Sequence, residues 1–316
     1  MQNRPLGSTG LQVSPIAFGG NVLGWTLDEA GSFAVLDAYA AGGGNFVDTA
    51  DVYSRWVPGH AGGESETILG RWMAARGLRH RMVIATKAGM DMGDGGKGLS
   101  RAHLLRSVDA SLRRLRTDHI DLFQSHVDDA DTPQEETLRA YDDLVRAGKV
   151  RTIGASNFGA ARLEQALDLS ASLGLPSYGC LQPHYNLLER TGFEADLEAV
   201  CRARGLGVIP YFSLASGFLT GKYRSESDLG QSPRGAWIRK HLGPRGHRIL
   251  AALDAVARAH ASQPAAVALA WLLAQPTVTA PIASATSVSQ VATLLEGARI
   301  TLGADEVAAL DTASAP

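Results

Sequence analysis

Short apolar runs rich in β-branched residues alternate along the chain with longer segments in which apolar residues recur at helical spacing. The short runs predict buried strands, and the longer segments, several of which open with Ser, Thr or Asn and close on Gly, predict amphipathic helices. The expected strands are residues 15–19, 45–48, 82–87, 119–126, 150–156, 178–186, 206–212 and 277–283, and the expected helices include 64–77, 99–116, 132–148 and 158–174.

The strict alternation of strand and helix predicts a parallel sheet. Eight such units in a chain of 316 residues favour an α/β fold of the (β/α)8 TIM-barrel type over an open sheet. A hairpin over residues 4–14 precedes the first strand and is expected to cover the barrel floor. The segment 213–276, after the seventh strand, is a long insertion with helices expected at 246–260 and 264–274. With no linker or shift in composition, residues 1–316 are predicted to form a single domain.

Composition narrows the partners and the compartment. A net charge of -2 with 45% hydrophobic residues gives no reason to expect nucleic acid or an acidic membrane as partner. The first ten residues lack the apolar run of a signal peptide, so we expect a cytoplasmic chain. Cys180 and Cys201 form no CxxC pair and are predicted to be reduced core residues. No heptad or exposed apolar helix predicts the oligomeric state.

Four polar residues lie at or just after the ends of consecutive predicted strands: Asp48, Tyr53, Lys87 and His126. The carboxyl ends of barrel strands meet at one mouth, so these side chains should converge there. Each alone could be a turn cap, a packing residue or a solvated group. Together, on three neighbouring strand ends, they favour a functional site.

The chemistry of this set predicts a site that protonates an oxygen atom. A free phenol has a pKa of about 10, and the Lys87 ammonium is expected to lower the pKa of Tyr53 while Asp48 balances the lysine charge. His126 could orient a carbonyl oxygen or share its proton with Tyr53. The alternative is a metal-dependent barrel hydrolase that uses the Asp-rich loop 125–131, although a solvated loop is the preferred interpretation there and no metal is expected.

Six segments, in order along the chain, carry a resemblance to a known family. They are VDTADVY (47–53), ATK (85–87), FQSH (123–126), GKVRTIGASNF (148–158), LQPHYNLLER (181–190) and SLASGFLTGKY (213–223). Together they resemble the signature segments of the aldo-keto reductase superfamily, in the branch that holds bacterial enzymes and potassium-channel β-subunits. The similarity extends from the hairpin 4–14 to segment 281–291.

The resemblance implies an NAD(P)H-dependent oxidoreductase that reduces aldehydes or ketones, possibly sugar-derived, to alcohols by hydride transfer. It implies Tyr53 as general acid, Lys87 and Asp48 as the groups that tune its pKa, and His126 as the residue that places the carbonyl. The same branch leaves open a second hypothesis, a cofactor-sensing binding module with slow turnover. The direction of the reaction in the cell stays open.

The resemblance also implies a cofactor site, and the absence of a GxGxxG motif argues against a Rossmann site. NADP(H) is expected ahead of NAD(H), because Lys222, with Arg224 or Arg234, could bind a 2′-phosphate while segment 284–295 has no Lys or Arg. The expected cofactor contacts are Ser156, Asn157 and Gln182 at the nicotinamide, Tyr211 stacked on its ring, Ser213, Leu214, Gly217, Lys222 and Arg234 at the phosphates, Gly20 and Asn21 on the other side, and Thr286 and Gln290 at the adenosine. Asp48 is also expected among the cofactor-binding residues.

Substrate contacts are expected from Trp25 and Trp56 beside Tyr53 and His126, with Trp237 as a further candidate. Each tryptophan could equally be loop packing. Aromatic walls suit small apolar or ring-shaped carbonyl compounds, whereas the polar loop 89–98 would tolerate sugars. The expected partner is therefore a small-molecule carbonyl or alcohol.

Overall fold

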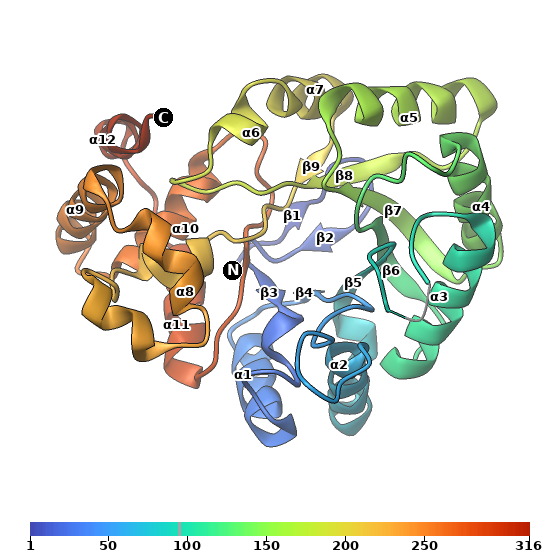
Figure 1. The fold of residues 1–316 in the computed structure, drawn as a ribbon, viewed down its shortest axis with the longest axis horizontal. Coiled ribbons are helices and arrows are strands. Elements are labelled where there is room, and N and C mark those ends of the chain that lie inside the picture. Colours follow the sequence, from blue (N-terminus) through green and yellow to red (C-terminus); the bar gives the residue numbers. More distant parts are fainter. Residues whose placement is uncertain (94–95) are drawn as a thin grey trace.

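A parallel sheet that curls into a barrel forms the centre of the molecule (Figure 1). The structure, a computed structural model, describes residues 1–93 and 96–316, and within them eight parallel strands form one sheet. Across the closing seam, Val208 forms a parallel bridge with Val278, and the N–H of Thr279 donates to the carbonyl of Val208 at 2.8 Å. The predicted (β/α)8 barrel is confirmed. In spatial order the strands are β10 (Ile282–Ala283), β3 (Ala17–Gly19), β4 (Phe46–Asp48), β5 (Val83–Ala88), β6 (Ile120–Ser125), β7 (Val150–Ser156), β8 (Tyr178–Gln182) and β9 (Gly207–Val208).

Helices surround the sheet and bury their apolar sides against it (Figure 1). Ser100 caps one of the predicted helices, α3, by accepting a hydrogen bond from the His103 N–H. Two others, α4 and α5, begin after Pro133 and Gly159 without a side-chain cap. The helices are α1 (Glu29–Ala41), α2 (Glu64–Arg76), α3 (Arg101–Leu115), α4 (Gln134–Arg146), α5 (Ala160–Leu173), α6 (Thr191–Glu194), α7 (Leu197–Arg204), α8 (Gly235–Ile238), α9 (Pro244–Ala259), α10 (Pro264–Ala274), α11 (Val288–Gly297) and α12 (Ala304–Ser314), with short 3-10 turns η1 (Gly20–Val22) and η2 (Arg79–Arg81).

The predicted N-terminal hairpin closes one end of the barrel. Strands β1 (Arg4–Pro5) and β2 (Gln12–Val13) pair antiparallel. Leu6 and Val13 are fully buried and pack with residues that point into the barrel, among them Phe46 and Leu122. Gly7 has a φ of +50°, and a Cβ there would overlap the backbone nitrogen of Gly207, so the turn of the hairpin lies directly against the strands.

The long connection after β9 contains the two predicted helices as α9 and α10. Before them, the structure has short helical turns that the sequence pattern did not predict: η3 (Ala215–Thr220), η4 (Glu226–Gln231), α8 and η5 (Arg239–His241). Turns of this length show no apolar period and depend on individual side chains. One such contact joins the hydroxyls of Tyr223 and Ser232 at 2.7 Å.

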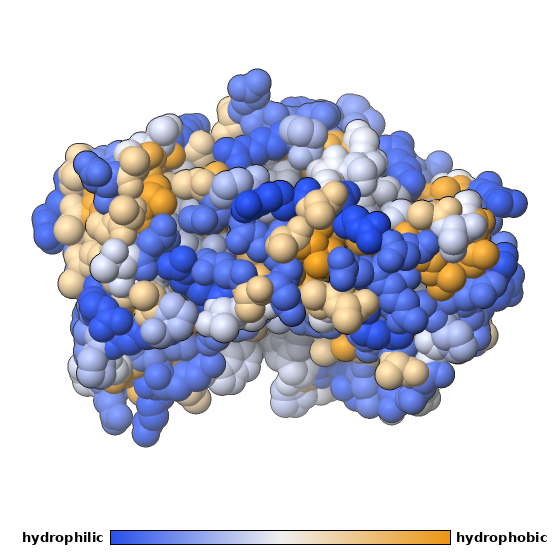
Figure 2. Space-filling view, turned by 90° about the horizontal axis from the view of Figure 1, so that it is seen from above, coloured by the Kyte–Doolittle hydropathy of each residue, from blue (hydrophilic) through white to orange (hydrophobic). Residues whose placement is uncertain are grey.

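The surface seen from above carries hydrophobic residues in separate patches among hydrophilic ones (Figure 2). Across residues 1–93 and 96–316, no helix combines the length and apolar character needed to cross a membrane. Cys180 and Cys201 are both buried and free.

Candidate active site

The four residues expected at the barrel mouth come together in the structure. Asp48 is the last residue of β4, Lys87 lies in β5 and His126 follows β6 directly, while Tyr53 lies in the turns after β4. Asp48, Lys87 and His126 are buried, with exposed fractions of 1%, 0% and 8%, and Tyr53 is half-buried. We call these four residues the tetrad.

Lys87 and Asp48 form a fully buried ion pair. The lysine Nζ donates to Oδ1 and Oδ2 of Asp48 at 2.8 and 2.7 Å and to the carbonyl oxygen of Thr49 at 2.8 Å. An ammonium group has three N–H donors, so the arrangement suits a protonated lysine. Burial lowers the pKa of Lys87, and the charge of Asp48 opposes this shift.

The Tyr53 hydroxyl contacts both members of this ion pair. It lies 3.2 Å from Lys87 Nζ and donates to Asp48 Oδ2 at 3.2 Å. Burial of the hydroxyl raises the pKa of Tyr53 well above its ordinary value, and the Asp48 carboxylate adds to the effect. The expected lowering of this pKa is wrong for the structure, because burial of the hydroxyl and the adjacent carboxylate both favour the neutral phenol. Tyr53 therefore holds its proton at neutral pH.

His126 presents a neutral imidazole beside the phenol. Its ring packs edge-on against Tyr53 at a centroid distance of 6.2 Å. Burial, and secondarily the charge of Lys87, lowers the pKa of His126 well below its ordinary value. The buried Nδ1 finds no hydrogen-bond partner among the described residues. A neutral imidazole still has one N–H donor, so His126 can donate a hydrogen bond to an oxygen at the mouth.

Two glutamines complete the surroundings of the Asp48 carboxylate. Gln182 Nε2 donates to Asp48 Oδ1 at 2.8 Å, and Gln124 Nε2 donates to the same oxygen at 3.3 Å. Gln182 is one of the residues expected at the nicotinamide, and its amide N–H contacts the Asp48 carboxylate of the tetrad. Gln124 was not expected at all. Its position two residues before His126 on β6, and therefore on the same side of that strand, is the signal that could have identified it.

The loop after β9 has the backbone of an anion cradle. Phe212, Ala215, Ser216 and Gly217 all have φ values between +47° and +101°, which non-glycine residues rarely adopt. Lys222 Nζ lies close to Gly217, since a Cβ built there would be 3.9 Å from it. Lys222 is exposed and forms no ion pair with the described acidic residues. Curved backbone with a free cation fits a phosphate group.

A flat aromatic ring and an amide lie between this loop and the tetrad. The Tyr211 ring stacks on His184 at a centroid distance of 5.1 Å, and its hydroxyl donates to Asn157 Oδ1 at 2.8 Å. Asn157 Nδ2 in turn donates to the backbone carbonyl of His126 at 2.9 Å. Ser156 is buried and donates to the carbonyl of Gln182 at 3.0 Å. These contacts bring Ser156, Asn157 and Tyr211 next to the tetrad.

The remaining expected cofactor residues make contacts of three kinds. Asn21 Oδ1 accepts from the Ser284 hydroxyl at 2.6 Å, which joins the loops after β3 and β10. Gln290 Oε1 accepts from the backbone N–H of Thr286 at 2.8 Å, at the start of α11. The others pack inward: Gly20 and Ser213 are buried and Leu214 is half-buried.

Tryptophans line one side of the mouth. The rings of Trp25 and Trp56 meet edge to face at 5.4 Å, and Trp56 lies 6.0 Å from the Tyr53 ring. The centroid of the Trp237 ring lies 6.4 Å from that of the Trp25 ring. The guanidinium of Arg234 is placed here, 4.9 Å from the centroid of the Trp25 ring. We call Trp25, Trp56, Trp237 and Arg234 the tryptophan wall.

In the Asp-rich loop after His126, Asp131 is exposed, whereas Asp128 and Asp129 are half-buried and hydrogen-bonded. Asp128 accepts two hydrogen bonds from Arg162, at 2.8 and 2.9 Å, and Asp129 accepts from the Leu99 N–H at 2.7 Å. Among the residues that the structure describes, no three His, Cys, Asp or Glu side chains are arranged to hold a metal ion. In the neighbouring loop 89–98, expected to tolerate sugars, residues 94–95 lie outside the described residues.

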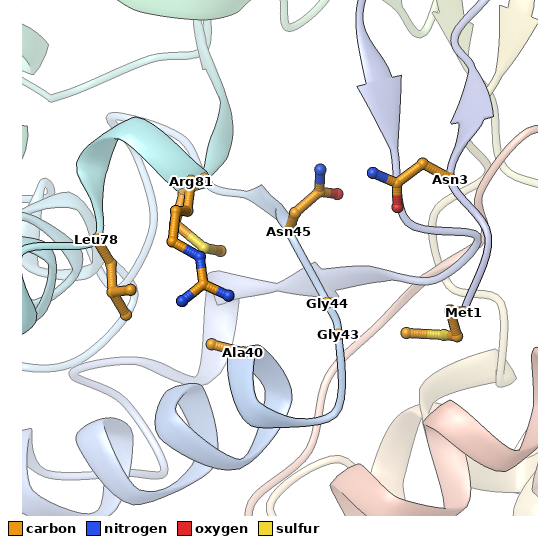
Figure 3. A pocket seen from close by; sticks show the side chains of 9 residues that line it. Met1, Asn3, Ala40, Gly43, Gly44, Asn45, Leu78 and Arg81 are labelled. Atoms are coloured by element: carbon orange, nitrogen blue, oxygen red, sulfur yellow. The ribbon is translucent and has the colours of Figure 1, made fainter.

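A cavity of about 470 Å³ lies near the N-terminus and contains no tetrad residue (Figure 3). Its lining includes Met1, Asn3, Asn45 and Arg81, and Asn45 directly precedes β4. Since Asp48 ends the same strand, the cavity and the tetrad lie at opposite ends of the barrel.

Comparison with known proteins agrees with this geometry. A sequence model described as the aldo/keto reductase family matches residues 15–315. The chain is 36% identical over 312 residues to the uncharacterized oxidoreductase YrpG of Bacillus subtilis, covering 96% of this chain and 92% of that protein. It is 33% identical over 299 residues to a probable voltage-gated potassium channel subunit beta of Oryza sativa, covering 92% and 89%. It is 31% identical over 326 residues to a norsolorinic acid reductase of Aspergillus flavus, covering 97% and 79%. The chain belongs to the aldo/keto reductase family.

Proposed function

We propose that the chain reduces aldehydes or ketones to alcohols with NADPH, and that Tyr53 donates the proton. The contact of the Tyr53 hydroxyl with Lys87 and Asp48, both at 3.2 Å, is the observation that carries this proposal. A protonated phenol at the mouth of a barrel, beside a neutral imidazole, can donate hydrogen bonds to a carbonyl oxygen. Membership of an oxidoreductase family supports the reaction class.

In this mechanism the cofactor supplies the hydride that adds to the carbonyl carbon. His126 donates a hydrogen bond to the carbonyl oxygen and orients the substrate. As negative charge grows on that oxygen, the Tyr53 Oη proton transfers to it and the alcohol forms. Lys87 then stabilises the phenolate that remains, and Asp48 holds Lys87 in place through both carboxylate oxygens.

The residues that would hold the cofactor lie on one side of the tetrad. Ser156, Asn157 and Tyr211 would bind the nicotinamide, with the Tyr211 ring fixed by its stacking on His184. The backbone of 213–217 with Lys222 would bind the phosphates. Thr286, Gln290 and Asn21 are the proposed contacts further along the cofactor.

NADPH is proposed ahead of NADH because of Lys222. The sequence offers two other cations for the 2′-phosphate, Arg224 and Arg234. Arg224 is engaged by both oxygens of Asp254, at 2.9 and 2.8 Å, and Arg234 lies against Trp25. Lys222 is exposed, lies close to Gly217 and has no acidic partner among the described residues.

The relationship to a channel β-subunit favours a second candidate, a cofactor-sensing module with slow turnover. Both candidates require nucleotide binding, so turnover separates them. Purified protein should be titrated with NADPH and NADH by fluorescence, and cofactor oxidation should then be followed by absorbance with a panel of aldehydes and ketones. Multiple turnovers with some member of the panel support the reductase. Tight NADPH binding without turnover on any member would favour the sensor, and no binding of either nucleotide would refute both.

A further inference from the structure

Asp51 is a buried carboxyl group beside the tetrad that the proposed mechanism does not use. It lies three residues after the end of β4 and is 3% exposed. Its backbone N–H donates to the carbonyl oxygen of Lys87 at 3.1 Å, and a Cβ at Gly62 would lie 2.8 Å from its own carbonyl oxygen, so the chain encloses this residue closely. The Oδ1 atom of Asp51 is buried and has no hydrogen-bond partner among the described residues.

The charged groups that face Asp51 are already paired with one another. Glu66 on α2 accepts from the Nε of Arg114 on α3 at 2.6 Å. Lys87 on β5 is paired with Asp48 on β4 at 2.7 Å. Two cations therefore balance two carboxylates in this layer, and within residues 1–93 and 96–316 Asp51 forms no ion pair. An ionised Asp51 would add a negative charge that nothing in the layer balances.

The protonated form of Asp51 is favoured for this reason. Burial of a carboxylate without a cation of its own is costly, and the group avoids the cost by holding a proton. Burial, and then the charge of Glu66, raises the pKa of Asp51 to about 7. Burial also raises the pKa of Tyr53 and lowers that of His126, both well away from their ordinary values. Asp51 can therefore change its charge near neutral pH while Tyr53 and His126 keep theirs.

The charge of Asp51 acts on the tetrad through Lys87. Burial lowers the pKa of Lys87, and the charge of an ionised Asp51 is among those that oppose this shift. The Lys87 Nζ lies 3.2 Å from the Tyr53 hydroxyl, where it stabilises the phenolate in the proposed mechanism. A further negative charge next to Lys87 offsets part of that stabilisation, because both charges act on the same phenolate oxygen.

We propose that Asp51 is a positioning residue for the reaction: its protonated form leaves the Lys87 charge available to the Tyr53 phenolate, and its ionised form offsets that charge. The inference rests on the proposed carbonyl reduction and adds the residue that sets the pH range of the tetrad. Asp51 touches neither substrate nor cofactor in this role. Reduction is fast while Asp51 holds its proton and slower once the proton is lost.

The rate of hydride transfer as a function of pH tests this inference. NADPH oxidation should be followed by stopped-flow absorbance in single turnovers, between about pH 5.5 and 8.5, with the aldehyde that the wild type reduces fastest. The wild-type rate should fall by about 3- to 10-fold as the pH rises through about 7, the size expected of one partly screened charge a few residues away. Asp51→Asn keeps the shape of the side chain without its charge and should hold the low-pH rate across the series. Glu29→Gln removes a carboxylate that is 47% exposed and should keep the wild-type profile.

Other profiles would overturn the inference. A wild-type rate that does not change through pH 7 refutes it, and so does an Asp51→Asn profile with the same pH dependence as the wild type. A loss of rate in Asp51→Asn that is equal at every pH would show a structural role alone, without an effect of charge.

A measurement without turnover separates this inference from the proposed function. Infrared difference spectra of the wild type between about pH 6 and 8 should show the loss of a protonated carboxyl band, which Asp51→Asn should lack. Because coupling between two sites is reciprocal, Lys87→Met should move this loss to higher pH. If no aldehyde is reduced and both infrared results are obtained, the reductase proposal fails while the coupling of Asp51 to Lys87 stands. A wild-type spectrum without this loss, or an unshifted loss in Lys87→Met, refutes the inference.

Discussion

Replacing Lys87 by Met should destabilise the folded chain, because it leaves the Asp48 carboxylate buried without its cation. The two side chains are 0% and 1% exposed and share two hydrogen bonds of 2.8 and 2.7 Å. Removing one partner of a buried ion pair costs about 3–5 kcal/mol. Gln182 and Gln124 still donate to Asp48 in the variant, so we expect a loss near the lower end, about 3 kcal/mol.

Removing the buried charge of Asp48 together with its partner should reverse this loss. The double variant Asp48→Asn with Lys87→Met has no buried charge at this position and should recover most of the lost stability at pH 7, without recovering activity.

Urea unfolding at pH 7, followed by circular dichroism, measures these free energies for the wild type, both single variants and the double variant. The reasoning is refuted if Lys87→Met lies within about 0.5 kcal/mol of the wild type at pH 7, a change typical of an ordinary surface substitution. It is also refuted if the double variant is no more stable than Lys87→Met.

Three further predictions concern pH, packing and cofactor choice. Burial and the charge of Glu66 raise the pKa of Asp51 to about 7, so the folded state keeps a proton that the unfolded chain releases near pH 4, and stability should fall between about pH 4 and 7. Asp51→Asn should flatten this fall in a thermal-melting series, and an unchanged slope would contradict the assignment. A Cβ at Gly154 would lie 2.6 Å from Cys180 Sγ, so Gly154→Ala should lower the free energy of unfolding by about 1–3 kcal/mol, as measured by thermal unfolding. A Cβ at Gly192 would have no heavy atom within 4 Å, so Gly192→Ala should not lower it. Equal effects of the two substitutions would count against this packing argument. Lys222→Ala should weaken NADPH binding about tenfold or more and NADH binding much less, as read by fluorescence titration, and equal weakening would remove Lys222 from the 2′-phosphate.

The barrel could be predicted because strands buried on both sides read as continuous apolar runs. The expected strand 150–156 coincides with β7. Of the expected strand 206–212, only Gly207–Val208 forms a strand, β9, because Pro210 has no N–H and interrupts the hydrogen-bond ladder. Convergence of the tetrad follows from barrel topology alone, since the ends of neighbouring strands must meet.

Features that depend on side-chain packing could not be predicted. The direction of the Tyr53 pKa shift reflects a balance between burial and two opposite charges, and a sequence shows only which charges are present. The contact of Gln124 with Asp48 crosses the barrel interior. Arg234 reaches Trp25 through short turns that carry no periodic signal, so the sequence could not bring these two side chains together.

The comparison of wild type with Tyr53→Phe tests the central claim most directly. The kcat for NADPH oxidation should be measured with the aldehyde that the wild type reduces fastest, together with the NADPH dissociation constant. The account predicts that kcat falls by about 10²–10⁴-fold while NADPH binding is retained, because only the proton donor is lost. A kcat close to that of the wild type would show that another group protonates the carbonyl oxygen, and would contradict the account.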